Sequence, residues 1–428
     1  MKIMKKIIAL LLVLALCIAL ASCGGNGGGN DGGTTAPDTP AGNTPTAPAD
    51  TGGSSDEPGV IKLGHLVSLT GWFGPIDKGN TDEITAFAAV INDDMGGWDI
   101  GGKKYKVEIV TSDMASDPAQ ARASVEYLAD QGVEFVFESS DLFTRGVENL
   151  WAELGIVHID QLPSDPTFAG PQFPYMYFSR GGVWTCYESG LKALQLGFPE
   201  AKKVAYCETD NGVNDLIVNE IVKPAADKLG LDFLSDNPIV FSGELTDFSA
   251  VALSLQNTGA DAYIAMGPPT INGAIIKELR TLGNDMVCIS ANPQSVDTLS
   301  MIAGGAGGFV SLMTLPGSDG LTQVFNDTHA KYMEMQGEEV AQTFDGNAPN
   351  SLYILLQMMS IAGSTDQQAV IDAWQVQDTI DTFFGPAPVC GAETMGSKRA
   401  VASPYGVTAM THDGVTSFKG HVLDVYVP

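Results

Sequence analysis

The sequence predicts an α/β fold made of two doubly wound lobes, each built on a parallel sheet. Short apolar runs alternate with segments of helical periodicity from residue 60, and the same alternation resumes at residue 203. Strands separated by helices form parallel sheets with helices on both faces. Residues 60–428 are also long enough for two domains at about 150 residues each. Two runs of alternation therefore indicate two lobes of similar plan.

The first run opens with an apolar strand at residues 60–67, followed by a loop rich in Gly and Pro at residues 68–79. Apolar side chains then recur at helical spacing over residues 80–95, and a Gly-Gly pair ends this helix. A second helix is expected at residues 117–131, because Asp117 suits an N-cap and Pro118 the first helical position. Further strands are expected at residues 105–110, 133–137 and 155–159.

The second run has the same plan. Strands are expected at residues 203–207, 261–266 and 286–289, and helices at 213–229 and 271–282. The glycine-rich stretch 304–308 follows a helix and precedes a strand, whereas a phosphate cradle needs the opposite order, so it is expected to be a turn. Residues 383–401 are expected to be irregular. Residues 405–427 are expected to form short antiparallel strands around a turn at 411–414.

Residues 1–22 are typical of a secretory signal peptide, with a basic start, a short apolar run and small residues at the cleavage point. The apolar run is shorter than the roughly 20 residues that a membrane span needs. Leu20-Ala21-Ser22-Cys23 resembles a bacterial lipobox, in which the cysteine receives a lipid and becomes the mature N-terminus. Residues 23–59 contain no aromatic residue and no aliphatic residue larger than Ala, so they are expected to be a lipid-anchored flexible linker.

The formal net charge of −29 argues against a nucleic-acid partner and against direct docking on anionic lipid. The chain has no phosphate-binding loop, no metal-ligand spacing and no nucleophile motif, so no metal, cofactor or enzymatic activity is expected. His65 and His158 lie inside predicted strands and are expected to be core residues with satisfied hydrogen bonds.

Four cysteines remain outside the signal peptide and the lipobox, and none of them forms a Cys-x-x-Cys pair. An exported protein can hold disulfides. Cys207 and Cys288 are the favoured pair if any bond forms, and four thiols, with Cys186 and Cys390, are the alternative.

Ligands of open parallel sheets bind beyond the carboxyl ends of the strands. Polar residues and one tryptophan follow the predicted strands of both lobes; they are Ser68, Thr70, Trp72, residues 138–141 and 160–164, then residues 208–211, 267–269 and 290–293. Turn chemistry and helix capping explain such residues one at a time. As a set, they favour a site for a small polar or anionic ligand.

Several short motifs occur in a specific order: Leu69-Thr70-Gly71, Asp113 with Ser116-Asp117-Pro118, Gly155-Ile156 leading to Asp165-Pro166, Pro174 to Arg180, and Gly385-Pro386. In these motifs the chain from Val60 to Pro428 resembles type I periplasmic binding proteins of the Leu/Ile/Val-binding family, the extracytoplasmic receptors of ABC importers. The resemblance implies two lobes joined by a three-strand hinge. The first lobe would take residues 60–179 and 315–401, and the second 180–314 and 402–428.

In that family, a serine after the third strand and a backbone-and-hydroxyl pair after the fourth hold the carboxylate and ammonium of the ligand. Ser139 or Ser140 matches the first position, and Pro163 with Ser164 matches the second. The resemblance therefore implies a carboxylate-bearing ligand that these residues grip.

Three positions depart from the amino-acid binders. Asn211 and Pro268 stand where those proteins often carry an aromatic residue, and Asn292 stands where they carry an acid for the ammonium. These departures argue against leucine, isoleucine or valine as the ligand. Glu138, Asp141 or Asp160 can supply the missing negative charge. Trp72 can stack on a flat ligand, or alternatively cover the core of its own lobe.

The resemblance implies a lipoprotein at the extracytoplasmic face of the cell membrane. It would capture an amino acid, an amide or an aromatic acid as a monomer and deliver it to ABC permease subunits. A ligand sensor of the same fold, signalling to a membrane or regulatory partner, is the alternative. The lipid on Cys23 and the linker favour import, because a tethered receptor can visit a permease.

Overall fold

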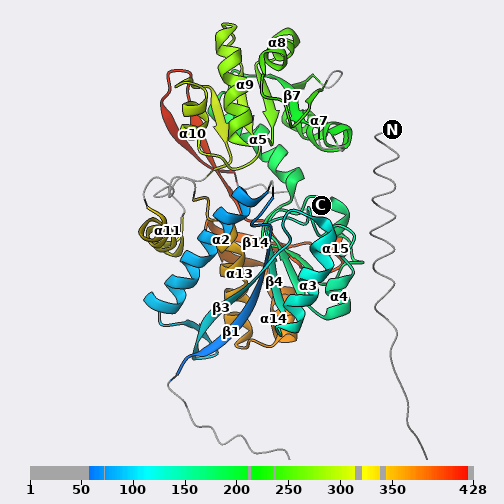
Figure 1. The fold of residues 1–428 in the computed structure, drawn as a ribbon, viewed down its shortest axis with the longest axis vertical. Helices are drawn as coiled ribbons and strands as arrows, with labels where there is room; N and C mark the ends of the chain where they lie inside the picture. The colour runs from blue at the N-terminus through cyan, green and yellow to red at the C-terminus, as the bar shows by residue number, and fades with distance from the viewer. Residues whose placement is uncertain are drawn as a thin grey trace, which may run out of the picture. The chain divides into compact units, whose positions relative to one another are not determined.

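The computed structural model describes residues 57–71, 73–210, 214–234, 238–313, 321–337 and 344–422. The predicted signal peptide, Cys23, Trp72 and Asn211 lie outside the described residues. Within these ranges the chain forms two separate sheets, each covered by helices (Figure 1).

The first sheet has nine strands in the described ranges, and its centre is parallel. In spatial order they are β13 (Thr379–Thr382), β14 (Gly385–Cys390), β15 (Ala400–Val401), β6 (Met176–Phe178), β5 (Val157–Asp160), β4 (Phe135–Glu138), β1 (Gly59–Val67), β3 (Lys103–Asp113) and β2 (Trp98–Ile100). Strands β2, β13 and β14 are antiparallel to their neighbours.

The second sheet is parallel from β8 to β12, and a C-terminal hairpin extends it in the antiparallel sense. In spatial order its strands are β17 (Thr416–Val422), β16 (Tyr405–Met410), β12 (Phe309–Ser311), β11 (Val287–Ser290), β10 (Ala262–Ala265), β7 (Lys203–Thr209) and β8 (Asp232–Phe233), with β9 (Ile239–Phe241) also pairing with β7. The doubly wound α/β prediction is therefore confirmed for both sheets.

Helices pack on both faces of each sheet. Those that follow strands of the first sheet or pack on it are α2 (Gly74–Ala89), η1 (Val90–Asp94), η2 (Pro118–Gln120), α3 (Ala121–Asp130), α4 (Leu150–Leu154), η3 (Pro166–Ala169), α11 (Gln323–Gln336), α13 (Asn347–Ala362), α14 (Gln367–Val376) and α15 (Ala392–Met395). Those of the second sheet are α5 (Val183–Gly197), α6 (Asn214–Leu216), η4 (Ile217–Val222), α7 (Lys223–Leu229), α8 (Ser249–Thr258), α9 (Pro269–Thr281) and α10 (Val296–Ile302).

Each face of each sheet has its own apolar core. In the first sheet, Leu63 of β1 packs with α2, α13 and α14, whereas Leu66 faces α3 and α4. In the second, Ile264 of β10 faces α5, and Tyr263 faces α8 and α9. The strands alternate between two cores because successive side chains of a strand point to opposite faces.

The chain passes between the two sheets three times, after β6, after β12 and after β15. Hydrogen bonds connect the first and third passages: Ser403 Oγ donates to the Ser179 carbonyl at 2.6 Å. The Arg180 guanidinium lies 5.6 Å from the centre of the Tyr405 ring. The three-strand hinge is thus present, while the exact lobe boundaries stay a prediction.

Two segments differ from the expectation. The first helix begins at Gly74 rather than at residue 80. Pro75 lies in the first turn of this helix, where proline is favoured, and not in a loop. Residues 383–401 were expected to be irregular but form β14, α15 and β15. Pro386 and Pro388 alternate with residues whose N–H groups remain available, and Val389 N donates to the Asp378 carbonyl at 3.0 Å. Prolines at alternate positions are therefore compatible with a strand, although they make it hard to predict from the sequence.

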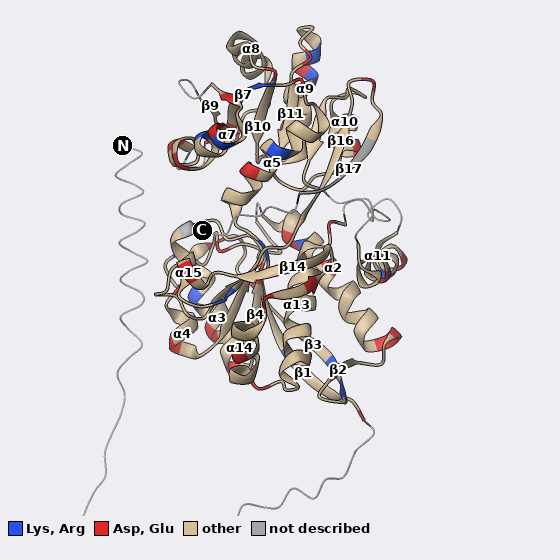
Figure 2. Cartoon of the chain, turned by 180° about the vertical axis from the view of Figure 1, so that it is seen from behind, with Lys and Arg blue, Asp and Glu red and all other residues tan. Residues whose placement is uncertain are grey.

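Acidic residues lie on elements of both sheets, in keeping with the negative net charge (Figure 2). In the part of the chain that the structure describes, no helix is both long and apolar enough to cross a membrane. Cys186, Cys207, Cys288 and Cys390 are free thiols, so the structure has the four-thiol alternative and not the Cys207–Cys288 bond.

Candidate functional site

The carboxyl ends of β5, β4 and β1 lie side by side at one edge of the first sheet. Leu66 pairs with Glu138, and Glu138 pairs with Asp160. The loops that follow these strands carry the predicted residues Ser139, Ser140, Pro163 and Ser164. The structure therefore brings the four first-lobe residues to one edge, where Ser139, Ser140 and Pro163 are buried and Ser164 is partly buried.

Ser139 belongs to a hydrogen-bond network around Asp77 in the first turn of α2. The Ser139 hydroxyl donates to Asp77 Oδ1, and the Ser68 backbone N–H donates to Asp77 Oδ2 at 2.6 Å. Asn80 Nδ2 donates to Ser139 Oγ at 2.9 Å. Burial raises the pKa of Asp77 to about 6, although these donors oppose the shift. Asp77 was not among the predicted site residues.

Ser164 belongs to a second network, around Asp141. The backbone N–H of Ser164 donates to Asp141 Oδ1 at 2.8 Å, and its hydroxyl donates to the same oxygen. Arg145 Nη2 donates to Ser164 Oγ at 2.8 Å. Asp141 Oδ2 is buried without a hydrogen-bond partner. Burial raises the pKa of Asp141 to about 6 against the opposing effect of the Ser164 donors and Arg145.

Asp160 and Glu138 complete the acidic edge. The Asp160 carboxylate accepts the backbone N–H groups of Asp141, at 3.2 Å, and Leu162, at 2.9 Å. Burial and the neighbouring Asp141 raise the pKa of Asp160 well above its usual range. Burial and the nearby Asp160 do the same to the pKa of Glu138. Four buried carboxyls thus converge on one edge of the sheet.

His158 partners Glu138 beneath this edge. Its Nε2 lies 2.8 Å from Glu138 Oε2, and its ring stacks on Trp151 with centroids 4.3 Å apart. Burial lowers the pKa of His158 to about 3, so it is a neutral imidazole beside a carboxyl that favours its neutral form. His65 is also buried, but neither ring nitrogen has a partner. The expectation of satisfied core histidines is therefore wrong for His65, and for Nδ1 of His158, which has no partner either.

The described second-lobe residues lie at the matching edge of the other sheet. Pro268 follows β10 and is exposed; its carbonyl accepts the N–H groups of Ile271 and Asn272, both at 3.1 Å. Asn292 follows β11, and its carbonyl accepts the Ser290 hydroxyl at 2.8 Å. Within the described ranges, no hydrogen bond joins Pro268 or Asn292 to the first-lobe residues.

Glu208, at the end of β7, is another buried carboxyl of the second lobe. It accepts the backbone N–H of Met266, and that of Thr209 at 3.0 Å. Burial raises its pKa. Glu208 therefore ties the ends of β7 and β10 together.

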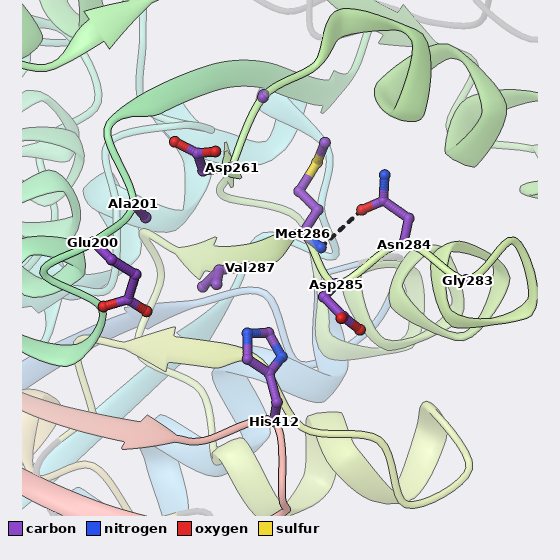
Figure 3. Close-up of a pocket in the computed structure, with 10 residues that line it drawn as sticks. Glu200, Ala201, Asp261, Gly283, Asn284, Asp285, Met286, Val287 and His412 are labelled. Atoms are coloured by element: carbon purple, nitrogen blue, oxygen red, sulfur yellow. Dashed lines mark hydrogen bonds between the residues drawn. The ribbon is translucent and has the colours of Figure 1, made fainter.

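A hollow of about 400 Å³ lies at the opposite, amino edge of the second sheet, beside His412 (Figure 3). Its polar groups already connect the strand starts: Asp261 Oδ2 accepts the N–H groups of Lys202 at 2.8 Å and Lys203 at 2.9 Å, and Asn284 Oδ1 accepts that of Met286 at 2.8 Å. Open parallel sheets bind ligands at the carboxyl edge, so the candidate site remains the one predicted at the other end of the strands. Among the described residues, no group of His, Cys, Asp and Glu side chains is arranged to hold a metal ion.

Comparison with known proteins agrees with this architecture. The sequence model of a family described as periplasmic binding protein matches residues 60–398. No curated protein sequence matches the chain. A solute-binding protein of an ABC transporter from Rhodopseudomonas palustris HaA2, in complex with p-hydroxybenzoic acid, has a similar fold with a TM-score of 0.66 and 17% identity, over 86% of this chain and 98% of that chain.

Two further solved structures are similar. A leucine-binding protein from Thermotoga maritima MSB8 has a TM-score of 0.64 and 16% identity, over 85% of this chain and 98% of that chain. A fatty acid ABC transporter substrate-binding protein from Thermomonospora curvata has a TM-score of 0.65 and 15% identity, over 86% of this chain and 93% of that chain. The family consists of extracytoplasmic binding proteins rather than enzymes. The chain belongs to the periplasmic binding protein family, and its fold is the type I fold of the Leu/Ile/Val-binding receptors.

Proposed function

We propose that this protein is the solute receptor of an ABC importer, anchored outside the cell membrane by a lipid on Cys23. It captures a small amino-acid-like or carboxylate ligand between its lobes and delivers it to permease subunits. The family match over residues 60–398 carries the proposal. The polar edge formed by the ends of β1, β4 and β5 supports it, because parallel sheets bind ligands there.

The ligand class draws support from similar structures. One is described with p-hydroxybenzoic acid, one as a leucine-binding protein and one as a fatty acid receptor. All three ligands carry a carboxyl group. The identities of 15–17% support the fold and leave the ligand of this chain as a proposal.

The proposed ligand-binding residues come from both lobes. The described ones are Ser139, Ser140, Pro163, Ser164, Pro268 and Asn292. Trp72 and Asn211 are proposed from the sequence alone. The burial of Ser139 and Ser140 at the strand ends supports their place in a water-excluding site.

Mass spectrometry of the small molecules released from natively purified protein tests the function. The expected result is one predominant compound, whose uptake is lost on deletion of the gene and restored by the gene in trans. Normal uptake together with a lost transcriptional response to the compound would instead favour the sensor.

The anchor is tested separately. Cys23→Ala should leave the precursor unprocessed or the protein released, because the thiol is the acylation site in a lipobox. Detergent phase partitioning measures this. A mature-size variant that stays in the membrane fraction would contradict lipidation at Cys23.

A further inference from the structure

The loop that follows β5 in the first lobe, residues 161–163, contacts the second lobe. The Pro163 carbonyl accepts the backbone N–H of Val183, the first residue of α5, at 2.9 Å. The first N–H groups of a helix have no acceptor within the helix, and Gly182 before α5 has no side chain to cap them. A carbonyl of the first lobe therefore caps a helix that packs on the second sheet.

Leu162 adds an apolar contact between the same two parts. Its side chain is partly buried and packs against the second-lobe core, which includes Leu191 and Tyr405. Asp160 helps to fix the conformation of the loop, since its Oδ1 accepts the Leu162 backbone N–H at 2.9 Å. A leucine of the first lobe thus covers part of the core of the second, and removing such a side chain from water is favourable.

Arg180 supplies a third contact, in the first passage of the chain between the sheets. Its Nε donates to the Gln161 carbonyl of the first lobe at 2.7 Å. Its guanidinium lies 5.6 Å from the centre of the ring of Tyr405, which belongs to β16 of the second lobe. A cation is attracted to the face of an aromatic ring, so the Arg180 side chain also connects the two lobes.

These contacts lie beside the part of the hinge that is free to bend. Ser403 Oγ donates to the Ser179 carbonyl at 2.6 Å, and Tyr405 Oη donates to the Gly181 carbonyl at 3.2 Å. The first and third passages are therefore joined to each other on both sides of Arg180. A change in the angle between the lobes is confined to the short stretch between these two bonds, and it alters the contacts of the 161–163 loop next to that stretch.

We propose that residues 161–163 and Arg180 form an inter-lobe brace that holds the ligand-free protein in the lobe arrangement of this structure, with Leu162 as its apolar contact. A solute that binds a different arrangement must break these contacts first, so the brace lowers the apparent affinity for that solute. The inference concerns the equilibrium between lobe arrangements, and it holds for an importer receptor or a sensor and for any class of ligand.

Distances between spin labels measure the lobe arrangement in the full-length protein freed of ligand. p-Acetylphenylalanine at positions 123 and 257, which are exposed on α3 and α8, carries one label on each lobe and leaves the cysteines unmodified. Leu162→Ala should increase the population outside the wild-type distance distribution about tenfold, because it removes most of the apolar contact. A folded Leu162→Ala protein with the wild-type distribution overturns the inference.

Leu229→Ala is the matched control. Leu229 is partly buried against the same core, but it lies on α7 of the second lobe itself. Both variants should lower the Tm, and only Leu162→Ala should change the distances between the lobes. Labels at positions 123 and 368, both exposed on helices of the first lobe, should keep their distance in every variant. Equal changes between the lobes in both variants indicate a loosened core and overturn the brace.

Hydrogen exchange tests the capping bond on the unaltered protein, and it decides the inference should Leu162→Ala fail to fold. The Val183 N–H has no acceptor within α5, so slow exchange of this amide reports its bond to the Pro163 carbonyl. Exchange should be at least tenfold slower than in an unstructured peptide, and exchange at the unstructured rate overturns the brace. A protein that imports its recovered ligand but leaves this amide unprotected keeps the receptor function and loses the brace.

Discussion

Replacement of His65 by leucine should stabilise the protein, and more so in acid. His65 lies on β1 on the same face as Ile61 and Leu63, within the core that α2 and α13 cover. Its side chain is 0% exposed and neither ring nitrogen has a partner. An unsatisfied buried polar group costs about 1–3 kcal/mol. Leucine has a similar volume and no polar atom, so it should recover part of that cost at every pH.

The pH dependence adds a second effect. Burial lowers the pKa of His65 from 6.5 to about 4, so the folded protein favours the neutral ring. His65 therefore costs the folded protein no stability through protonation above pH 6.5. As the pH falls from 6.5 through 4, the unfolded chain binds a proton at His65 that the folded protein does not bind, so the free energy of unfolding decreases. The loss amounts to about 2 kcal/mol near pH 5 and is close to zero near pH 8. His65→Leu removes this loss.

Urea unfolding near pH 8 and near pH 5 measures both effects. Asp77 and Asp141, whose pKa values burial raises to about 6, act in the opposite direction: their contribution is present in acid and is lost as the pH rises through 6. They are common to both proteins and cancel in the difference between variant and wild type. His412→Leu is the control, since it removes an exposed imidazole. A His65→Leu advantage that is equal at both pH values, or a variant less stable than wild type near pH 8, would refute the reasoning.

Two further outcomes are expected. Ser164→Ala should weaken ligand binding by about 1–3 kcal/mol, because the proposed site loses a hydrogen-bonding hydroxyl; unchanged binding would remove Ser164 from the site. The protein beginning at Gly59 should be a monomer that becomes more compact with its ligand, and an identical small-angle scattering profile at saturation would count against hinge closure.

Much of the fold was predictable because the apolar periodicity of a doubly wound protein is local. The strand expected at residues 60–67 is β1 (Gly59–Val67), and that expected at 286–289 is β11 (Val287–Ser290). Errors occur where the same residue type is common in two kinds of local structure. Pro75 starts a helix, although Gly-Pro pairs are common in loops. Short edge strands such as β15 depend on partners distant in the sequence, so local patterns carry little information about them.

The sequence predicted that the first-lobe candidate residues share one edge of a sheet, but it did not predict their hydrogen-bond partners. The strand-end rule located Ser139, Ser140, Pro163 and Ser164 on one edge, because the carboxyl ends of neighbouring parallel strands meet there. Asp77 was missed with the start of its helix, although an acid shortly after Gly74-Pro75 is typical of a first helical turn.

The polarity of the site depends on the direction of hydrogen bonds, which residue types do not reveal. The sequence does not distinguish a serine that binds a ligand carboxylate from a serine that binds a carboxylate of the protein itself. The partner of Ser164 stands 23 positions away and that of Ser139 62 positions away, so only the folded chain shows that both hydroxyls donate to carboxylates of the protein itself. A ligand carboxylate at this edge would therefore have to compete with Asp141 for Ser164 and with Asp77 for Ser139. The identity of the partner of each hydroxyl, more than the presence of the hydroxyl, therefore determines which class of solute such a receptor can select.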